Sequence, residues 1–392
     1  MAHVFKITND PYAGKLSIFR VHQGCIDSGS QLFVGDSRKA VKVAHLYRIQ
    51  GKEHIEIGRA IPGDICALGK VDEIDYDAIL HDCHDEDHYY LKPIDFPQPM
   101  FGLAVEALTR GQEQKLAMAL GRLSEEDPCF QVEHHQELNE TVIRGLGEMH
   151  LRIMLERIKN RYNVDVDTRP PRIAYRETIT RSAEGHHRHK KQTGGAGQFG
   201  EVFLRIRPLG RGEGFSFKSE VVGGAIPTSL IPAVEKGVRQ LLEEGAIAGF
   251  PLQDIEVTVY DGKFHAVDSK EVAFVVAGRK AFLDAIENAG PQILEPIVEL
   301  EVNVPDVAMG DITGTLAAKR ARIQGTDSLR GGATSISVAV PLSAVTDFPT
   351  ELKSLTGGEG RYTMSFSHYE AVPVNVQKDL VEQHSSRRSP EG

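Results

Sequence analysis

Two glycine-rich loops carry the side chains of this chain that are best suited to contact another molecule. Residues 190–200 (KKQTGGAGQFG) start with two lysines and lead into an alternating run, and residues 261–278 (DGKFHAVDSKEVAFVVAG) place His265 in a turn before an apolar run. Glycine lets a backbone approach a ligand closely, lysine pairs with phosphate, and imidazole stacks on a base. For the first loop the pattern favours contact with RNA, whereas a histidine such as His265 is by itself more often a solvated loop residue. We expect Asp268 and Ser269 to cap the helix that follows the second loop.

The first loop also matches G-x-G-x-x-G at residues 195–200. That dinucleotide fingerprint requires a helix directly after it, whose N-terminus faces the pyrophosphate. Val202, Leu204 and Ile206 alternate instead, which predicts a strand. A nucleotide-binding enzyme is therefore the alternative from another functional class, and a plain hairpin tip is a third explanation. The basic residues 186–191 before the loop favour phosphate steering over a merely solvated charge run.

Other groups of reactive residues favour structural explanations. Three imidazoles and one thiol lie between His81 and His88, which is enough ligands for zinc. Histidines so close in a polar linker seldom surround one ion, so we predict no metal site. Glu148 and His150 begin an amphipathic helix, where an acidic residue favours the helix dipole. Without paired carboxylates, a triad or a phosphate-cradling loop, no catalytic residue is expected in this chain.

The composition is that of an ordinary globular protein. The 392 residues are 41% hydrophobic and 26% charged, and the formal net charge is −10. This length predicts two to four domains. No run approaches the roughly 20 apolar residues of a membrane span, and no signal core or disulfide framework is visible. We expect a cytoplasmic protein with no membrane partner. The net negative charge argues against a protein that coats nucleic acid indiscriminately, while local basic patches suit a transient RNA partner.

The elements that must position the loops follow a repeated order. Short alternating runs in residues 1–86 predict a small antiparallel β-barrel. The order βαββαβ, that of a ferredoxin-like sandwich, is then predicted twice. The first copy has strands at 99–107, 130–133, 141–144 and 164–167 and helices at 112–126 and 148–161. The second has strands at 297–304, 322–326, 334–341 and 362–368 and helices at 310–321 and 349–355. Between them lies an amphipathic helix, Ile231–Glu244.

Motifs along the whole chain resemble one protein family. They are DPYAGKLSIFRVHQG (10–24), RLSEEDPCFQV (122–132), RGLGEMHLRIMLERI (144–158), HKKQTGGAGQFGEV (189–202), KFHAVDSKEVAF (263–274), MGDITGTLAAKRARIQG (309–325) and SFSHYEAVP (365–373). On these motifs the chain resembles bacterial elongation factor G. The resemblance implies a multidomain α+β fold. Its parts are a translation-factor β-barrel (1–90), a ferredoxin-like sandwich (95–168), a βαβ probe domain with a left-over-right S5-like fold (169–290), a second ferredoxin-like sandwich (291–374) and a mobile tail (375–392).

Three features depart from the family pattern. The family begins with a GTP-binding domain, whereas this chain has no G-x-x-x-x-G-K-[ST] motif and starts at Met1 in what would be a linker, so we expect a truncated protein. Ala196 stands where the housekeeping factor usually has arginine, which removes one phosphate contact. Residues 357–360 (GGEG) resemble the second, paralogous elongation factor G-like proteins of some bacteria.

The resemblance implies the ribosome-binding portion of a translational GTPase that supports GTP-driven movement of tRNA and mRNA during elongation. Ribosome recycling or another accessory role of a paralogue is the alternative. No cofactor is expected in this chain, because GTP and Mg belong to the GTPase domain of the parent protein. That GTPase domain is an expected partner, and the chain is otherwise expected to be a monomer. Residues 319–322 would face large-subunit RNA. The implied contacts to ribosomal RNA, or to tRNA and mRNA at the decoding centre, are His265, Lys263, Gly194, Gly195, Gly197, Gln198, Lys190, Lys191, Arg188, Lys319, Arg320 and Arg322.

Overall fold

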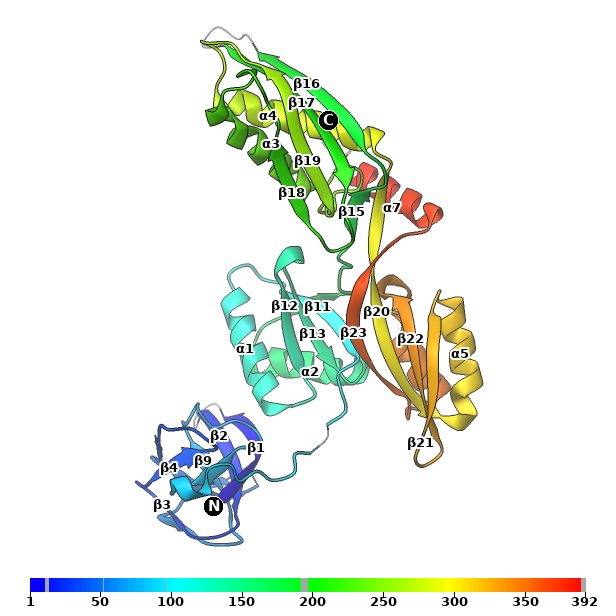
Figure 1. Ribbon diagram of the computed structural model, residues 1–392. Coiled ribbons are helices and arrows are strands. Elements are labelled where there is room, and N and C mark those ends of the chain that lie inside the picture. Colours follow the sequence, from blue (N-terminus) through cyan, green and yellow to red (C-terminus); the bar gives the residue numbers. More distant parts are fainter. Residues whose placement is uncertain (11–13, 52, 95, 192–196, 389–392) are drawn as a thin grey trace. The chain divides into compact units, whose positions relative to one another are not determined.

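The computed structural model describes residues 1–10, 14–51, 53–94, 96–191 and 197–388 (Figure 1). The chain divides into two compact units, Met1–Arg172 with Phe348–Thr363 and Ile173–Asp347 with Met364–Gly392. Both units combine helices with antiparallel or mixed sheets, so the predicted multidomain α+β fold is confirmed. Among the helices described, none is both long enough and apolar enough to cross a membrane.

The N-terminal part of the first unit is a curled, eight-stranded antiparallel sheet with the strand order β5-β4-β10-β1-β2-β9-β6-β7. Its strands are β1 (Ala2–Asp10), β2 (Gly14–Val21), β4 (Gln31–Val34), β5 (Val41–Lys42), β6 (Leu46–Gln50), β7 (Glu53–Glu56), β9 (Ile65–Gly69) and β10 (Ile79–His81), with β3 (Ile26–Asp27) and β8 (Arg59–Ala60) paired separately. Alternate side chains such as Val4, Phe19 and Leu68 fill the inside of the curl. This is the barrel that the short alternating runs predicted.

A four-stranded sheet follows in the first unit, with the order β12-β13-β11-β14. Its elements are β11 (Phe101–Ala107), α1 (Glu113–Glu126), β12 (Gln131–His135), β13 (Glu140–Gly145), α2 (Glu148–Tyr162) and β14 (Val166–Arg169). The buried stripes of the two helices, including Leu120 and Leu151, join the apolar face of the sheet in one core. The predicted βαββαβ order is therefore found here.

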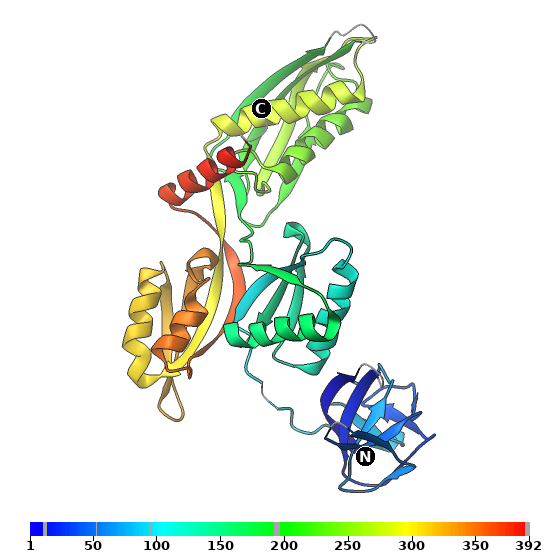
Figure 2. The same ribbon diagram turned by 180° about the vertical axis from the view of Figure 1, so that it is seen from behind.

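The second unit begins with β15 (Arg176–Ile179), followed by a sheet of order β16-β17-β19-β18. Its elements are β16 (Ala183–Lys191), β17 (Gln198–Pro208), β18 (Phe215–Ser219), α3 (Ile231–Glu244), β19 (Ile255–Lys263) and α4 (Glu271–Asn288). Strands β18 and β19 are parallel and α3 connects them, which makes the expected βαβ unit. Helices α3 and α4 lie side by side over one face of the sheet (Figures 1 and 2). Helix α4 lies so close to β16 that a Cβ at Gly185 would be 2.1 Å from the carbonyl oxygen of Ala281.

The C-terminal elements repeat the βαββαβ order. They are β20 (Pro291–Pro305), α5 (Met309–Ala318), β21 (Arg322–Leu329), β22 (Ala333–Pro341), α6 (Phe348–Leu355) and β23 (Arg361–Ala371). Strand β20 is longer than predicted, because its first residues pair with β15 and its later residues pair with β22. Helix α5 ends three residues earlier than predicted. Arg320 has a left-handed backbone (φ 62°) and turns toward the buried Glu295.

The tail that we expected to be mobile forms helix α7 (Val374–Arg388) as far as it is described. Val376 and Leu380, one helical turn apart, pack with Ile293 and Ala248 in a small apolar cluster. The Gln377 side chain accepts from the backbone N–H of Ile293 at 3.2 Å. The prediction missed this helix because its anchoring apolar residues, Val376, Leu380 and Val381, are interrupted by polar and charged ones, and the cluster that they join belongs to distant segments.

Candidate nucleic-acid interface

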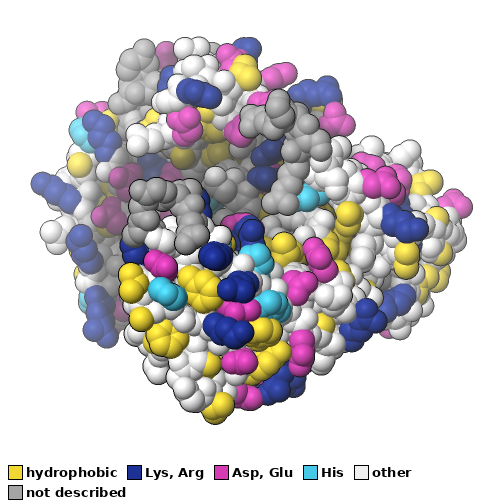
Figure 3. Space-filling model, turned by 90° about the horizontal axis from the view of Figure 1, so that it is seen from above, with side chains coloured by type: hydrophobic (Ala, Val, Ile, Leu, Met, Phe, Trp, Pro, Cys, Tyr) yellow, Lys and Arg dark blue, Asp and Glu magenta, His cyan; other side chains and the backbone are white. Residues whose placement is uncertain are grey.

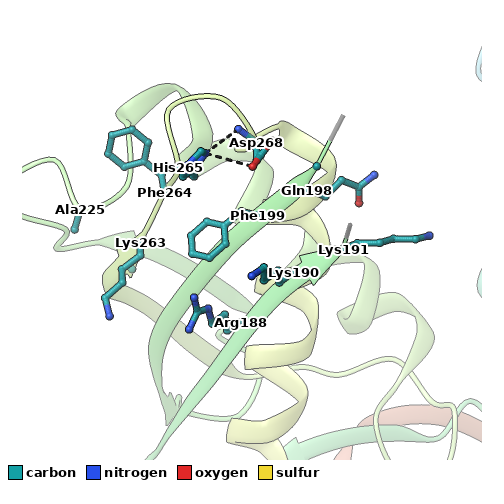
Figure 4. A pocket seen from close by; sticks show the side chains of 12 residues that line it. Arg188, Lys190, Lys191, Gln198, Phe199, Ala225, Lys263, Phe264, His265 and Asp268 are labelled. Carbon is teal, nitrogen blue, oxygen red and sulfur yellow. Dashed lines mark hydrogen bonds and ion pairs between the residues drawn. The ribbon is translucent and has the colours of Figure 1, made fainter. Parts of the chain in front are cut away.

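The two glycine-rich loops meet at the end of the β16–β17–β19 sheet and line one open pocket of about 540 Å³ (Figure 4). Seven of the predicted site residues line this pocket, which we call the tip pocket. They are Arg188, Lys190, Lys191, Gly197, Gln198, Lys263 and His265. Gly194 and Gly195, together with Ala196, lie outside the described residues. Phe199 and Phe264, which were not among the predicted site residues, also line the pocket.

Ser269 fastens the two loops to each other. Its hydroxyl accepts from the backbone N–H of His265 at 2.8 Å and donates to the carbonyl oxygen of Phe199 at 2.9 Å. The N–H of Phe199 in turn donates to the carbonyl oxygen of Asp268 at 2.9 Å. Helix α4 has Lys270 at its N-cap, without a side-chain capping bond. The prediction that Asp268 and Ser269 cap this helix was therefore wrong, because Ser269 bonds across to β17 and the Asp268 side chain lies beside His265.

His265 is held in its turn by the backbone around it. Its Nδ1 lies 3.4 Å from the N–H of Val267, 3.3 Å from the N–H of Asp268 and 3.4 Å from the Asp268 carboxylate (Figure 4). Nδ1 is thus engaged within the turn, which leaves Nε2 as the ring nitrogen for a ligand. The side chain is 58% exposed, and its ring lies edge-on to Phe199 with the centroids 6.5 Å apart.

Basic and aromatic side chains alternate around the pocket. The register pairs Lys190 with Phe199 and Lys191 with Gln198, so these two pairs project from opposite faces of the sheet (Figure 4). The guanidinium of Arg188 lies over the Phe199 ring, 5.3 Å from its centroid. Seen from above, basic, acidic, His and hydrophobic side chains are interspersed on this face of the molecule (Figure 3). Such a surface offers phosphates a charge partner and bases a flat ring.

The predicted basic run, residues 186–191, is part of strand β16, so its side chains divide between two faces. His187 faces the helices, and burial, with Lys280 as the second cause, lowers the pKa of its imidazole. On the face of the sheet away from the helices, His186 Nε2 lies 2.9 Å from Oε1 of the buried Glu201, and Lys263 Nζ lies 3.8 Å from Oε2. Glu201, which was not among the predicted site residues, therefore orients two basic side chains beside the pocket.

The nucleotide-binding alternative lacks its main structural requirement. The first described residues after the glycines form strand β17, which begins at Gln198, where the dinucleotide fingerprint requires a helix. The predicted strand is thus confirmed. Without a helix N-terminus at this position, the described part of the loop has no dipole aimed at a pyrophosphate.

The predicted residues 319–322 lie between the end of α5 and the start of β21, and not at the tip pocket. Arg320 makes a bidentate pair with the buried Glu295, at 2.6 and 2.9 Å, and this carboxylate raises the pKa of the guanidinium. Arg322 contacts Glu370 at 2.6 Å. The structure thus gives both arginines intramolecular partners that the sequence did not indicate, and their contact with RNA stays a prediction, as does that of Lys319.

The histidine-rich stretch near residue 81 serves the barrel. The buried His81 ring has Nδ1 2.8 Å from the carbonyl oxygen of Cys83 and Nε2 2.7 Å from that of Gly35. His88 contacts Asp36 at 3.2 Å. Within the described ranges, no three His, Cys, Asp or Glu side chains are grouped so that they could hold a metal ion.

Comparisons with known proteins agree with this architecture. Four family models match successive segments: elongation factor G domain 2 (residues 1–75), domain III (96–170), domain IV (171–290) and the elongation factor G C-terminus (292–380). A solved structure from Thermus thermophilus is 34% identical with a TM-score of 0.78, covering 98% of this chain and 57% of that one. The chain thus spans little more than half the length of that relative. Because the matches run in order through barrel, sandwiches and tip, the chain belongs to the elongation factor G family.

Proposed function

We propose that this chain is the ribosome-binding portion of a translational GTPase and supports GTP-driven movement of tRNA and mRNA during elongation. The observation that carries the proposal is the tip pocket. Two loops fastened by Ser269 present basic side chains around the rings of Phe199 and His265. Family membership supports the ribosome as partner. GTP and Mg²⁺ would be held by the GTP-binding domain of the whole protein.

The tip pocket suits a task in which RNA is held briefly in one position. Backbone contacts already fix His265 and Ser269, so little side-chain freedom is lost when RNA binds. Lys190 and Arg188 can pair with phosphates, while the rings offer stacking surfaces that do not depend on base identity. Such contacts would let the tip occupy space beside tRNA and mRNA and block their backward movement, whichever codon is present.

The test uses the full-length protein with its GTP-binding domain in single-round translocation on purified ribosomes. His265→Ala should slow translocation by roughly fivefold to 150-fold, the range that loss of one base–ring stack supports. Ribosome-stimulated GTP hydrolysis should stay near the wild-type rate, because this residue is placed in the RNA-contacting tip. The matched control is Lys236→Ala, at an exposed position of helix α3 on the other side of the sheet. An equal loss of translocation and hydrolysis in the histidine variant would refute the role of the tip.

Ribosome recycling or another accessory role is the second candidate, and one observation favours it. The residues 357–360 that resemble paralogous factors form a turn after α6, in which Gly357 and Gly358 have φ values of 61° and 92°. Glycine adopts such angles readily, so this sequence is suited to the turn that the chain makes here. Subunit splitting with the recycling factor, in the absence of translocation, would assign the protein to this role.

A further inference from the structure

The sheet that carries the tip pocket has one face that no described element of its unit covers. Helices α3 and α4 pack on the other face (Figures 1 and 2). Leu204 and Val202 point toward those helices and are fully buried. Their neighbours along β17 therefore point outward, together with the residues of β16 and β19 that the register places beside them. We call this the outer face.

A preformed ring stack lies on the outer face, below the tip pocket. The His186 and Phe203 rings, paired across β16 and β17, have centroids 4.0 Å apart and an interplanar angle of 18°. The bond from His186 Nε2 to the buried Glu201 carboxylate, 2.9 Å, fixes the orientation of the imidazole. His186 is 44% exposed. One side of its ring covers Phe203, so its other side is a flat surface open to a ligand.

The stack continues the tip pocket without a break. Arg188, two residues from His186 on the same face of β16, lies over Phe199 in the pocket wall. On the other side of the stack, the Tyr260 ring lies 6.3 Å from that of Phe203. Same-face residues of a strand are about 6.8 Å apart. A row of cations and rings thus runs from the tip down the sheet.

The basic side chains of this row differ in their partners from those on the rest of the outer face. Farther from the tip, Arg205 pairs with Glu220, and Arg207 and Lys218 both pair with Glu256, so those cations already have carboxylate partners. Nearer the tip, the buried Glu201 is shared between His186 and Lys263. The Asp261 carboxylate accepts from the N–H of Gly262 at 2.8 Å. Arg188 and Lys190 add positive charge there, which favours a polyanion at this end of the face only.

We propose that the outer face binds an unpaired segment of RNA that runs from the tip pocket to His186. A base stacks on the exposed side of the His186 ring, and its phosphate pairs with Arg188. The ligand is single-stranded, because the bases of a duplex are stacked on each other and cannot cover a protein ring. The inference rests on the proposed function for RNA as the partner, and it adds a stacking position outside the two loops.

Fluorescence anisotropy of the full 392-residue chain with a short labelled oligoadenylate at low salt tests this site directly. His186→Gln keeps a donor for Glu201 but has no ring, and should weaken binding by about fivefold to a hundredfold. His186→Phe keeps the ring and loses the donor, and should stay within about threefold of wild type on the same stacking argument. Lys236→Ala on α3 is the control for charge. Ultraviolet cross-linking should place the oligonucleotide on residues 183–208.

The outcomes separate this inference from the proposed function. Equal affinities of the Gln and Phe variants, or no binding of oligoadenylate by the wild type, would overturn the stacking site. Ribosome binding by the full-length protein could still be intact in either case. Stronger binding of an RNA duplex than of oligoadenylate would also refute it. Conversely, a ring-dependent affinity for oligoadenylate without any ribosome binding would support the site and refute the proposed function.

Discussion

A single carboxylate organises the loop at the base of the probe domain. Glu177 on β15 is fully buried. Its Oε2 accepts from the backbone N–H groups of Ala246 at 2.6 Å and Ile247 at 3.0 Å, and its Oε1 from those of Ala248 at 2.8 Å and Phe250 at 3.1 Å. Four donors thus converge on one side chain. We predict that Glu177→Gln releases this loop.

The size of the effect follows from these bonds. Glutamine keeps the shape, but its amide nitrogen is a donor, so two of the four backbone N–H groups would face another donor. A hydrogen bond to a charged group contributes about 1.5–3 kcal/mol, and a buried donor left unpaired costs a similar amount. The substitution should therefore lower the free energy of local opening by about 3–6 kcal/mol. One factor of ten corresponds to about 1.4 kcal/mol, so amide exchange should accelerate roughly 10²- to 10⁴-fold.

Hydrogen exchange with peptide-level readout is the appropriate assay, because a multidomain chain gives no single unfolding free energy. Amides 246–250 should show the acceleration, and the α7 amides should follow, since α7 packs against Ala248. Glu287→Gln, at an exposed position of α4, is the matched control and should change nothing. Unchanged exchange at 246–250 in Glu177→Gln would show that the carboxylate is not what holds this loop.

Three other substitutions test the packing and electrostatics of the second unit. Gly185→Ala should separate β16 from α4 and cost at least about 3 kcal/mol, because its Cβ would overlap the Ala281 carbonyl; unchanged exchange in α4 would contradict this. Arg320→Lys should weaken the C-terminal sheet by about 2 kcal/mol, since lysine cannot make the bidentate pair with Glu295, and a urea titration followed at β20 checks it. Two basic neighbours lower the pKa of Glu256 from 4.5 to about 2. The stability that the ionised Glu256 contributes to the folded state is therefore complete above pH 4.5 and is lost as the pH falls toward 2. Glu256→Gln should flatten the acid dependence of β19 exchange over that interval, and an unaltered profile would refute the assignment.

The sequence predicted the elements best where local signals are strong. Helix α3 has the predicted bounds, Ile231–Glu244, because proline lies in its first turn, Gly245 follows its last residue, and its apolar residues recur at helical spacing. Bounds set by distant partners were missed. The first residues of β20 pair with β15, and just beyond the end of α5 the left-handed Arg320 pairs with Glu295. Neither partner is visible from local composition.

The tip pocket was predictable in its charges but not in its construction. Loop composition identified Lys190 and His265 without reference to any fold. Ser269 was assigned the wrong role, that of a helix cap, because its hydroxyl donates to Phe199, 70 residues away. The spacing of Phe199 and Phe203 was a usable signal, since residues four apart along a strand share one face. Followed further, it would have indicated an aromatic outer face.

Strand β20 connects two regions of the second unit without a loop between them. Its early residues pair with β15, at the base of the probe domain, and residues 297–305 pair with β22 in the C-terminal sheet (Figure 1). The two regions therefore share one continuous strand, Pro291–Pro305, in place of a loop connector. A load applied along this strand would be borne by many backbone hydrogen bonds in shear at once.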